Sequence, residues 1–180
     1  MNDTITLYDK DFKIYIEHDD IMIKIRKIGE KISKNFENKN VILIGILNGS
    51  FMFLSDLAKH LSINCSISFI KVSSYENMNS TGKVSEILGL NDNIENKNVI
   101  VVEDIIDSGL TIKNLKKNLE KHNPLDITIC SLFYKPKAIK YTESKPDYCA
   151  FNIDNQFIVG YGLDYNGLGR NLKNIYKLSE

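Results

Sequence analysis

The chain has 180 residues, of which 43% are hydrophobic and 26% charged, with 23 Lys and Arg against 23 Asp and Glu. This balance disfavours a disordered chain, and a net charge of zero disfavours a protein drawn as a whole to nucleic acid or to an anionic membrane. No apolar run approaches the ~20 residues needed to cross a bilayer, and the polar N-terminus lacks the features of a secretory signal. Three cysteines without paired spacing indicate thiols in a reducing compartment. We expect one cytoplasmic domain over residues 1–180, with neither nucleic-acid nor membrane partners.

The first predicted elements alternate between helix and strand. Apolar residues at positions 21, 25, 28, 32 and 36 have helical spacing, and Asp19 or Asp20 is placed to cap the N-terminus of that helix. Val41–Leu47 is a continuous apolar run rich in β-branched residues, which predicts a buried strand. The turn Asn48-Gly49-Ser50 and a helical pattern over residues 51 to 61 follow it. Residues 65 to 72 predict another strand.

The rest of the chain continues the alternation after one long interruption. Residues 73 to 90 are polar and have no period, which predicts a long loop, and loops of that length usually cover a binding site. The strongest strand, Val99-Ile100-Val101-Val102, precedes a helix that carries Leu115 and Leu119. Residues 127 to 133, 148 to 153 and 157 to 159 predict further strands. Apolar strands alternating with helices indicate an α/β fold with a mostly parallel sheet covered on both faces.

The segment after this strongest strand carries the main chemical signal. In open α/β sheets, ligands bind beyond the carboxyl ends of the strands. Asp107-Ser108-Gly109-Leu110-Thr111 offers successive backbone N–H groups, two hydroxyls and a glycine at a predicted helix N-terminus, which suits a phosphate. Glu103 and Asp104, just before it, can accept hydrogen bonds from sugar hydroxyls or face Mg²⁺. A sugar phosphate with Mg²⁺ is the joint interpretation, and the alternative is an acidic turn that only caps a helix.

The run Val-Ile-Val-Val-Glu-Asp-Ile-Ile-Asp-Ser-Gly-Leu-Thr, residues 99 to 111, closely resembles the signature of type I phosphoribosyltransferases that binds phosphoribosyl pyrophosphate (PRPP). Leu47-Asn48-Gly49-Ser50, Ser74-Tyr75, Lys135 and the closing segment from Phe157 to Tyr165 with Arg170 resemble the hypoxanthine-guanine branch, in the right order. The resemblance covers roughly residues 12 to 178. It implies a twisted, mostly parallel sheet flanked by helices, with a small hood built from the N- and C-terminal segments.

The resemblance also implies residue roles. The residues expected to bind PRPP and its phosphate are Glu103, Asp104, Ile106, Asp107, Ser108, Gly109, Leu110 and Thr111. Those expected at pyrophosphate are Asn48, Gly49, Ser74, Tyr75 and Arg170. Those expected at the base are Lys135, Phe157, Ile158 and Asp164, and those expected at the metal are Glu103, Asp104 and Asp164. Many relatives carry Lys or Arg where this chain has Asn48, so a charged contribution to that turn is missing here.

The implied reaction is purine salvage: transfer of the phosphoribosyl group of PRPP to hypoxanthine or guanine with Mg²⁺, by a homodimer or homotetramer. Asp107 would be the catalytic acid/base near N7 of the base, with a simple capping aspartate as the alternative. Lys135 would donate to O6, with a solvated lysine as the alternative and Lys137 as the substitute if the alignment shifts. Phe157 would stack on the purine, with plain core packing as the alternative.

Two other functions compete with this one. A regulatory protein that senses PRPP and binds nucleic acid would need a basic surface, against which the zero net charge argues. A phosphoribosyltransferase for xanthine, adenine or a pyrimidine would share the signature, although the pattern of Lys135 and Phe157-Ile158 favours 6-oxopurines. A P-loop hydrolase is excluded because no Gly-x4-Gly-Lys-Ser/Thr segment exists.

Overall fold

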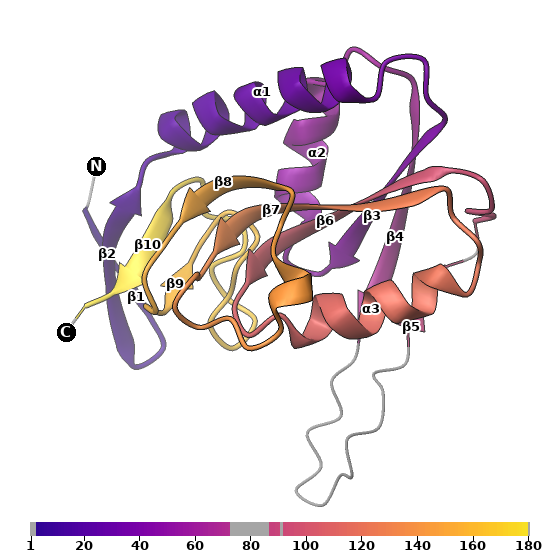
Figure 1. The fold of residues 1–180 in the computed structure, drawn as a ribbon. Helices are drawn as coiled ribbons and strands as arrows, with labels where there is room; N and C mark the ends of the chain where they lie inside the picture. The colour runs from indigo at the N-terminus through magenta and orange to yellow at the C-terminus, as the bar shows by residue number, and fades with distance from the viewer. Residues whose placement is uncertain (1–2, 73–86, 91, 180) are drawn as a thin grey trace, which may run out of the picture.

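A computed structural model describes residues 3–72, 87–90 and 92–179, and its centre is a six-stranded sheet (Figure 1). The strand order is β5-β4-β3-β6-β7-β8, and every neighbouring pair is parallel except β4 and β5. The strands are β3 (Val41–Leu47), β4 (Cys65–Val72), β5 (Ile87–Leu88), β6 (Asn98–Ile106), β7 (Asp126–Tyr134) and β8 (Tyr148–Asn152). The predicted α/β class with a mostly parallel sheet is therefore confirmed.

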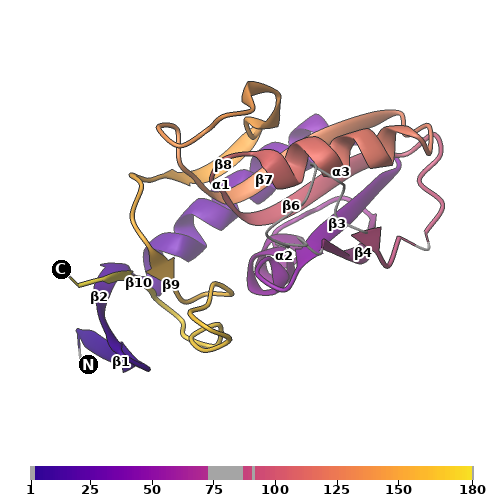
Figure 2. The same ribbon diagram turned by 90° about the horizontal axis from the view of Figure 1, so that it is seen from below.

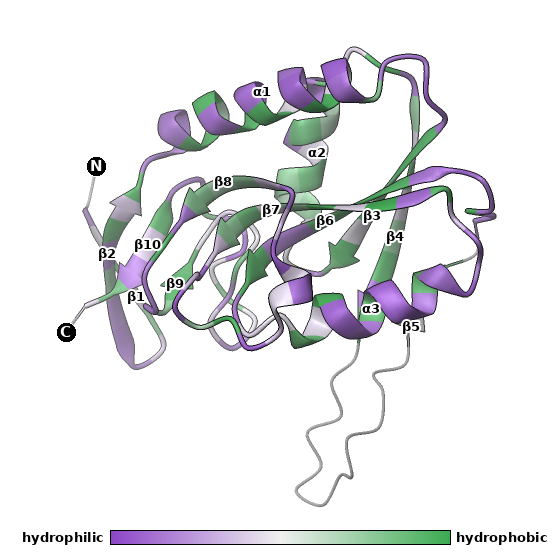
Figure 3. Cartoon of the chain, in the orientation of Figure 1, coloured by the Kyte–Doolittle hydropathy of each residue, from purple (hydrophilic) through white to green (hydrophobic). Residues whose placement is uncertain are grey.

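Helices cover both faces of this sheet. In Figure 1, α1 (His18–Asn35) and α2 (Phe51–Lys59) lie on one side and α3 (Leu110–Glu120) on the other. On β6, Ile100 and Val102 pack in the cluster with α1 and α2, whereas Val99 and Val101 pack with α3. Because both faces are buried, the central strands are continuously apolar, and Figure 3 shows polar residues mainly on the outer sides of the helices. None of the helices in the described ranges has the length and apolarity to span a bilayer.

A second, antiparallel sheet forms the expected hood from both ends of the chain. Its order is β1-β2-β10-β9, with β1 (Thr4–Leu7), β2 (Lys10–Ile16), β10 (Ile175–Leu178) and β9 (Ile158–Val159). Figure 2 shows these strands set off at one end of the central sheet. A small core of Phe12, Val159 and Tyr176 holds the hood together. The sequence pattern did not reveal β1, β2 or β10, because short half-buried strands give little periodic signal.

Several predicted boundaries differ from the structure. Helix α1 begins at His18 after Glu17, so Asp19 and Asp20 lie in its first turn and do not cap it. The backbone N–H of His18 instead donates to Oδ1 of Asn174 over 2.9 Å, a partner that no local pattern reveals. Helix α2 ends at Lys59, and Phe157 lies just before β9. Of the predicted loop over residues 73 to 90, residues 73–86 lie outside the described residues, and β5 occupies positions 87 and 88.

Candidate active site

The turns that follow β3, β6 and β7 meet at one edge of the central sheet. These three strands are parallel neighbours, so their carboxyl ends lie side by side. That edge brings together the turn at Asn48 and Gly49, the segment from Glu103 to Thr111, and Lys135. Ligands in open α/β sheets bind at this edge, which makes it the candidate site.

The segment of residues 103–111, here the signature loop, forms an anion cradle at the start of α3. Gly109 precedes α3 with a φ of +84°, and a side chain there would overlap Ile139 and Ser144. The Ser144 hydroxyl donates to the carbonyl oxygen of Gly109 over 2.8 Å, and the Lys140 N–H donates to that of Ser108 over 3.0 Å. With these carbonyls held from behind, the first-turn N–H groups of α3, which lack intrahelical partners, are left for a ligand. The loop encloses a hollow of about 90 Å³.

The two carboxylates of the signature loop have different surroundings. Glu103 is buried and lines the hollow, and its Oε2 has no hydrogen-bond partner within the described residues. Burial, and then the charge of Asp104, raises the pKa of Glu103 well above its ordinary value. Asp104 lies against Gly49 instead, and burial raises its pKa to about 6, against the opposing effects of its backbone hydrogen bonds and Arg170. Both carboxylates are thus short of compensating positive charge.

The turn after β3 is closely packed on both sides. The peptide bond between Leu47 and Asn48 is cis, the Asn48 side chain is exposed and Gly49 is buried. A methyl group on Gly49 would overlap the Asp104 carboxylate, and one on Gly162 would overlap the Gly49 carbonyl oxygen. The close approach of these segments at the turn therefore requires glycine at both positions 49 and 162.

Residues 157–170, here the C-terminal loop, bring a charged pair to the same edge. Arg170 Nη2 lies 2.6 Å from Asp164 Oδ1, and Arg170 Nη1 donates to the Gly162 carbonyl oxygen over 2.7 Å. The other oxygen of Asp164 accepts from the Gly167 N–H over 2.7 Å. The charge of Asp164 also acts to raise the pKa of Asp104, and that of Arg170 to lower it. Asp164 and Arg170, the predicted metal and pyrophosphate residues of this loop, therefore lie close enough to Asp104 to shift its pKa.

Lys135 and Asp107 form an ion pair between the turns after β7 and β6. The ammonium of Lys135 lies 2.8 Å from Asp107 Oδ2 and 3.4 Å from Asn155 Oδ1. Lys135 is only 8% exposed, whereas Lys137 projects from the surface and pairs with Asp154. Asp107 does not cap α3, because Gly109 occupies the capping position without a side-chain hydrogen bond. The structure therefore favours Lys135 over Lys137 at the site, and Asp107 as a site residue over a helix cap.

Phe157 is neither a core residue nor a free surface residue. It is 46% exposed, and its ring centroid lies 5.8 Å from that of Tyr165 and 6.2 Å from that of Phe12. One side of the ring is thus supported while part of it remains open, as a stacking residue requires. Ile158, in β9, is buried.

Comparison with known proteins agrees with this geometry. The phosphoribosyl transferase domain model matches residues 13–166. A hypoxanthine-guanine phosphoribosyltransferase of Streptococcus pyogenes is 40% identical over 169 residues, which are 93% of each chain. The chain belongs to the phosphoribosyltransferase family, in its hypoxanthine-guanine branch. A second relative in that branch, the hypoxanthine-guanine-xanthine phosphoribosyltransferase of Tritrichomonas foetus, is 37% identical over 180 residues, 100% of this chain and 98% of its own.

Solved phosphoribosyltransferase structures share the fold. A crystal structure of a hypoxanthine-guanine phosphoribosyltransferase from Bacillus anthracis has a TM-score of 0.84 at 38% identity and covers 93% of this chain and 97% of its own. A hypoxanthine phosphoribosyltransferase of Trypanosoma cruzi reaches a TM-score of 0.87 at 29% identity, covering 97% and 95%. The expected architecture, including the hood, is that of this family.

The predicted site residues on the turns after β3, β6 and β7 gather at the edge described above, whereas Phe157 and Ile158 lie at strand β9 of the hood. Ser74 and Tyr75 lie outside the described residues. Sequence reasoning missed Asn155, which holds Lys135, and the bond between Asp56 and Tyr161 behind the site. No local motif marks these residues, because each acts through a partner at least 20 positions away.

Proposed function

We propose that this phosphoribosyltransferase is a purine salvage enzyme that converts hypoxanthine or guanine and PRPP to IMP or GMP and pyrophosphate. The observation that carries the proposal is the ion pair between Lys135 and Asp107 beside the signature loop. O6 and N7 lie on one edge of a 6-oxopurine, so a donor for O6 and a carboxylate for N7 must be neighbours. These two groups are 2.8 Å apart.

The reaction forms the bond from N9 to C1′ of the ribose while the bond from C1′ to the pyrophosphate oxygen breaks, with its electron pair leaving on pyrophosphate. The proton on N7 passes to the Asp107 carboxylate, which has a half-exposed side chain and can receive it. The Lys135 ammonium donates to O6 and holds the base in register. Phe157 stacks on one face of the purine ring. The neighbouring ring of Phe12 and the buried Ile158 hold the Phe157 side chain and strand β9 in place.

The departing pyrophosphate needs positive charge and N–H donors. Arg170 and the backbone of Gly49 supply them from opposite sides of the same packed contact. The 5′-phosphate of the ribose lies in the hollow at the N-terminus of α3, where Ser108 and Thr111 add hydroxyl donors. Ser74 and Tyr75, outside the described residues, stay predictions for the pyrophosphate end.

The acidic side chains fit a Mg²⁺ ion. Glu103 Oε2 is buried without a partner within the described residues, and the pKa of Asp104 is raised by burial and by Asp164. In the described ranges no three acidic, His or Cys side chains form a metal cluster, and Mg²⁺ commonly takes one or two carboxylates together with substrate oxygens. Asp104 and Asp164, whose charges act on each other, would hold it together with substrate oxygens, and Glu103, which lines the separate hollow, stays a prediction from the resemblance. When bound, Mg²⁺ neutralises charge on the pyrophosphate leaving group.

We further propose a cytoplasmic location and a homodimer or homotetramer, as the family resemblance implies. Three free cysteines, of which Cys130 is fully buried, support a reducing compartment. Sedimentation of the purified enzyme measures the assembly.

A spectrophotometric assay tests the proposed function. Hypoxanthine, guanine, xanthine and adenine are each mixed with PRPP, Mg²⁺ and folded protein. We expect turnover of hypoxanthine or guanine and little of adenine, because the 6-amino group points donors at the Lys135 ammonium. A site built around one hydrogen bond rejects such an analogue by roughly 10⁴-fold. Absence of turnover with both 6-oxopurines would refute the proposal.

A further inference from the structure

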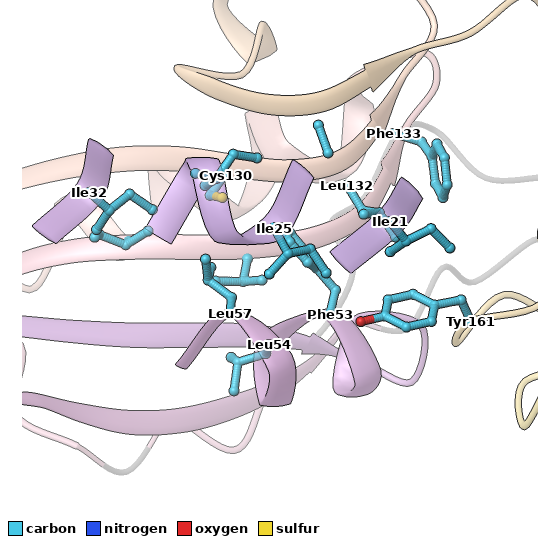
Figure 4. Packing of buried hydrophobic residues seen from close by; sticks show 14 of the residues in the cluster. Ile21, Ile25, Ile32, Phe53, Leu54, Leu57, Cys130, Leu132, Phe133 and Tyr161 are labelled. Carbon is cyan, nitrogen blue, oxygen red and sulfur yellow. The ribbon is translucent and has the colours of Figure 1, made fainter. Parts of the chain in front are cut away.

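A partly buried hydrogen bond joins two distant segments behind the pyrophosphate end of the site. The Tyr161 hydroxyl donates to Oδ2 of Asp56 on α2 over 2.5 Å, across 105 positions of sequence. Tyr161 is fully buried, and Figure 4 shows its ring beside Phe53 with the phenol oxygen directed toward that residue. Lys59 pairs with the other oxygen of Asp56 over 2.8 Å from the surface side. The Asp56 carboxylate is thus shared by one buried and one exposed donor.

The charge states make Tyr161 the donor. Burial, and then the hydrogen bond to Asp56, raises the pKa of the Tyr161 phenol, so it keeps its proton. Burial acts to raise the pKa of Asp56, but the hydrogen bonds from Lys59 and Tyr161 outweigh it and leave that pKa lowered. A hydrogen bond from a neutral donor to a charged acceptor is stronger than one between neutral groups.

The backbone on either side of Tyr161 has an unusual conformation. Gly160, Tyr161 and Gly162 have successive φ angles of +103°, +46° and +100°. The Tyr161 N–H donates to the Leu172 carbonyl over 2.8 Å, and the Gly162 N–H donates to the Arg170 carbonyl over 2.9 Å. The C-terminal loop therefore folds on itself, and the Tyr161 side chain ties this folded unit to α2.

The C-terminal loop also contacts the turn after β3, at Gly49. Gly162 packs directly on the Gly49 carbonyl oxygen, and its own carbonyl accepts from Arg170 Nη1. Helix α2 begins immediately after the turn, and Ser50 anchors that junction by donating from Oγ to the Ile46 carbonyl over 2.7 Å. The turn, α2, the bond from Asp56 to Tyr161, and Gly162 thus form a closed ring of contacts.

We infer that Asp56 and Tyr161 are positioning residues for pyrophosphate: their hydrogen bond fixes the Gly49 backbone relative to Arg170. The inference rests on the proposed function, because it assigns these two groups to the leaving pyrophosphate. Lys135 and Asp107 lie on the turns after β7 and β6, outside the ring. Loss of the bond therefore acts mainly on PRPP and pyrophosphate and leaves the purine contacts of Lys135 and Asp107 in place.

The first experiment compares Tyr161→Phe with the wild-type enzyme. We expect the KM for PRPP and the Kd for Mg²⁺-pyrophosphate, measured by calorimetry, to rise roughly tenfold, the value of one hydrogen bond to a charged group. The KM for hypoxanthine should stay unchanged. A lower melting temperature with an unchanged Kd for pyrophosphate, or an equal rise in both KM values, overturns the inference.

A matched set at Asp56 keeps the test decisive if Tyr161→Phe does not fold. Asp56→Asn retains a neutral acceptor for the phenol and should lose less pyrophosphate affinity than Asp56→Ala, which should reproduce the full loss. Lys59→Ala removes only the exposed partner of Asp56 and should leave both KM values unchanged. Equal affinities for the Asn and Ala variants contradict the inference. Inactivity of the wild-type enzyme on both 6-oxopurines would instead refute the proposed function.

Discussion

The signature loop and the C-terminal loop reach the same site by opposite routes. The signature loop is one strand, one turn and one helix start, and its key groups lie within nine consecutive positions. The C-terminal loop depends on partners more than 100 positions away: Gly162 on Gly49, and Tyr161 on Asp56. The residue types of the first are set within one short segment, and the second is placed by packing between distant segments.

This difference predicts how each loop responds to substitution. A change of a polar side chain in the signature loop should remove one chemical group and leave the fold intact, because those side chains project from a loop whose backbone is held by Ser144 and Lys140. A change in the packed ring should move several groups at once, so that stability and binding fall together. Three substitutions test this contrast, and a fourth tests Lys135 on the turn after β7.

The largest effect is expected for Asp107→Asn in the signature loop. The change keeps the size of the side chain and removes the proton acceptor, so kcat should fall ~10²–10⁴-fold. The melting temperature should fall only modestly, because the Asp107 side chain is 52% exposed and Asn keeps an acceptor for the buried Lys135 ammonium, which also contacts Asn155. Asp154→Asn, which breaks a similar but fully exposed pair with Lys137, is the matched control and should keep wild-type kcat. An unchanged kcat in Asp107→Asn would remove the acid/base role.

Gly162→Ala should lower both stability and PRPP affinity. Its φ of +100° disfavours a side chain, and the new methyl group would overlap the Gly49 carbonyl oxygen. We expect a loss of about 2–4 kcal/mol in unfolding free energy, from the strained backbone and the forced shift of the turn. Gly167 has a similar φ of +86° but open space around it. Gly167→Ala therefore isolates the free-energy cost of the backbone conformation, about 1–2 kcal/mol. Urea unfolding that shows equal losses for the two variants would contradict the packed contact.

Lys135→Ala should reduce kcat/KM for hypoxanthine by roughly 10–100-fold, because it removes a charged hydrogen bond to O6. Lys137→Ala is the matched control, since its ammonium pairs with Asp154 on the open surface, and it should retain wild-type activity. Steady-state kinetics with both variants measure the difference. Full activity of Lys135→Ala would show that another residue reads O6.

The smallest effect, and one of opposite sign, is expected for Asp104→Asn in the ligand-free protein. Burial raises the pKa of Asp104 from 3.8 to about 6, so the folded state binds its proton more tightly than the unfolded state does. Tighter proton binding by Asp104 stabilises the folded state below pH 4, and this stabilisation is lost as the pH rises through about 6. Because the side chain is partly exposed, Asp104→Asn should stabilise the protein at pH 8 by about 1–2 kcal/mol, and by less at pH 4.

Urea unfolding at both pH values measures this effect, and PRPP binding should fall in the same variant. Asp154→Asn provides the contrast, because the hydrogen bond from Lys137 lowers the pKa of Asp154 and its removal should bring no gain at pH 8. If Asp104→Asn proves no more stable at pH 8 than the wild type, the ionised Asp104 carboxylate does not destabilise the ligand-free protein.

The sequence by itself determined the parts of this protein that are local. The continuous apolar runs of β3 and β6, the start of α3 and the anion loop before it all follow from adjacent residues, because strand burial and helix N-termini are read over a few positions. The resemblance added the order of the remaining segments and the hood. Its choice of Lys135 over Lys137 agrees with the burial of Lys135.

Tertiary structure decided what depends on contacts between distant segments. It separated Glu103 from Asp104, placing one at the hollow of the signature loop and the other at Gly49. It capped α1 with Asn174 where the local sequence predicted Asp19 or Asp20. It also closed the ring through Asp56 and Tyr161. Such contacts leave no periodic trace in the chain, because they are set by how the hood and the central sheet pack and not by neighbours in sequence.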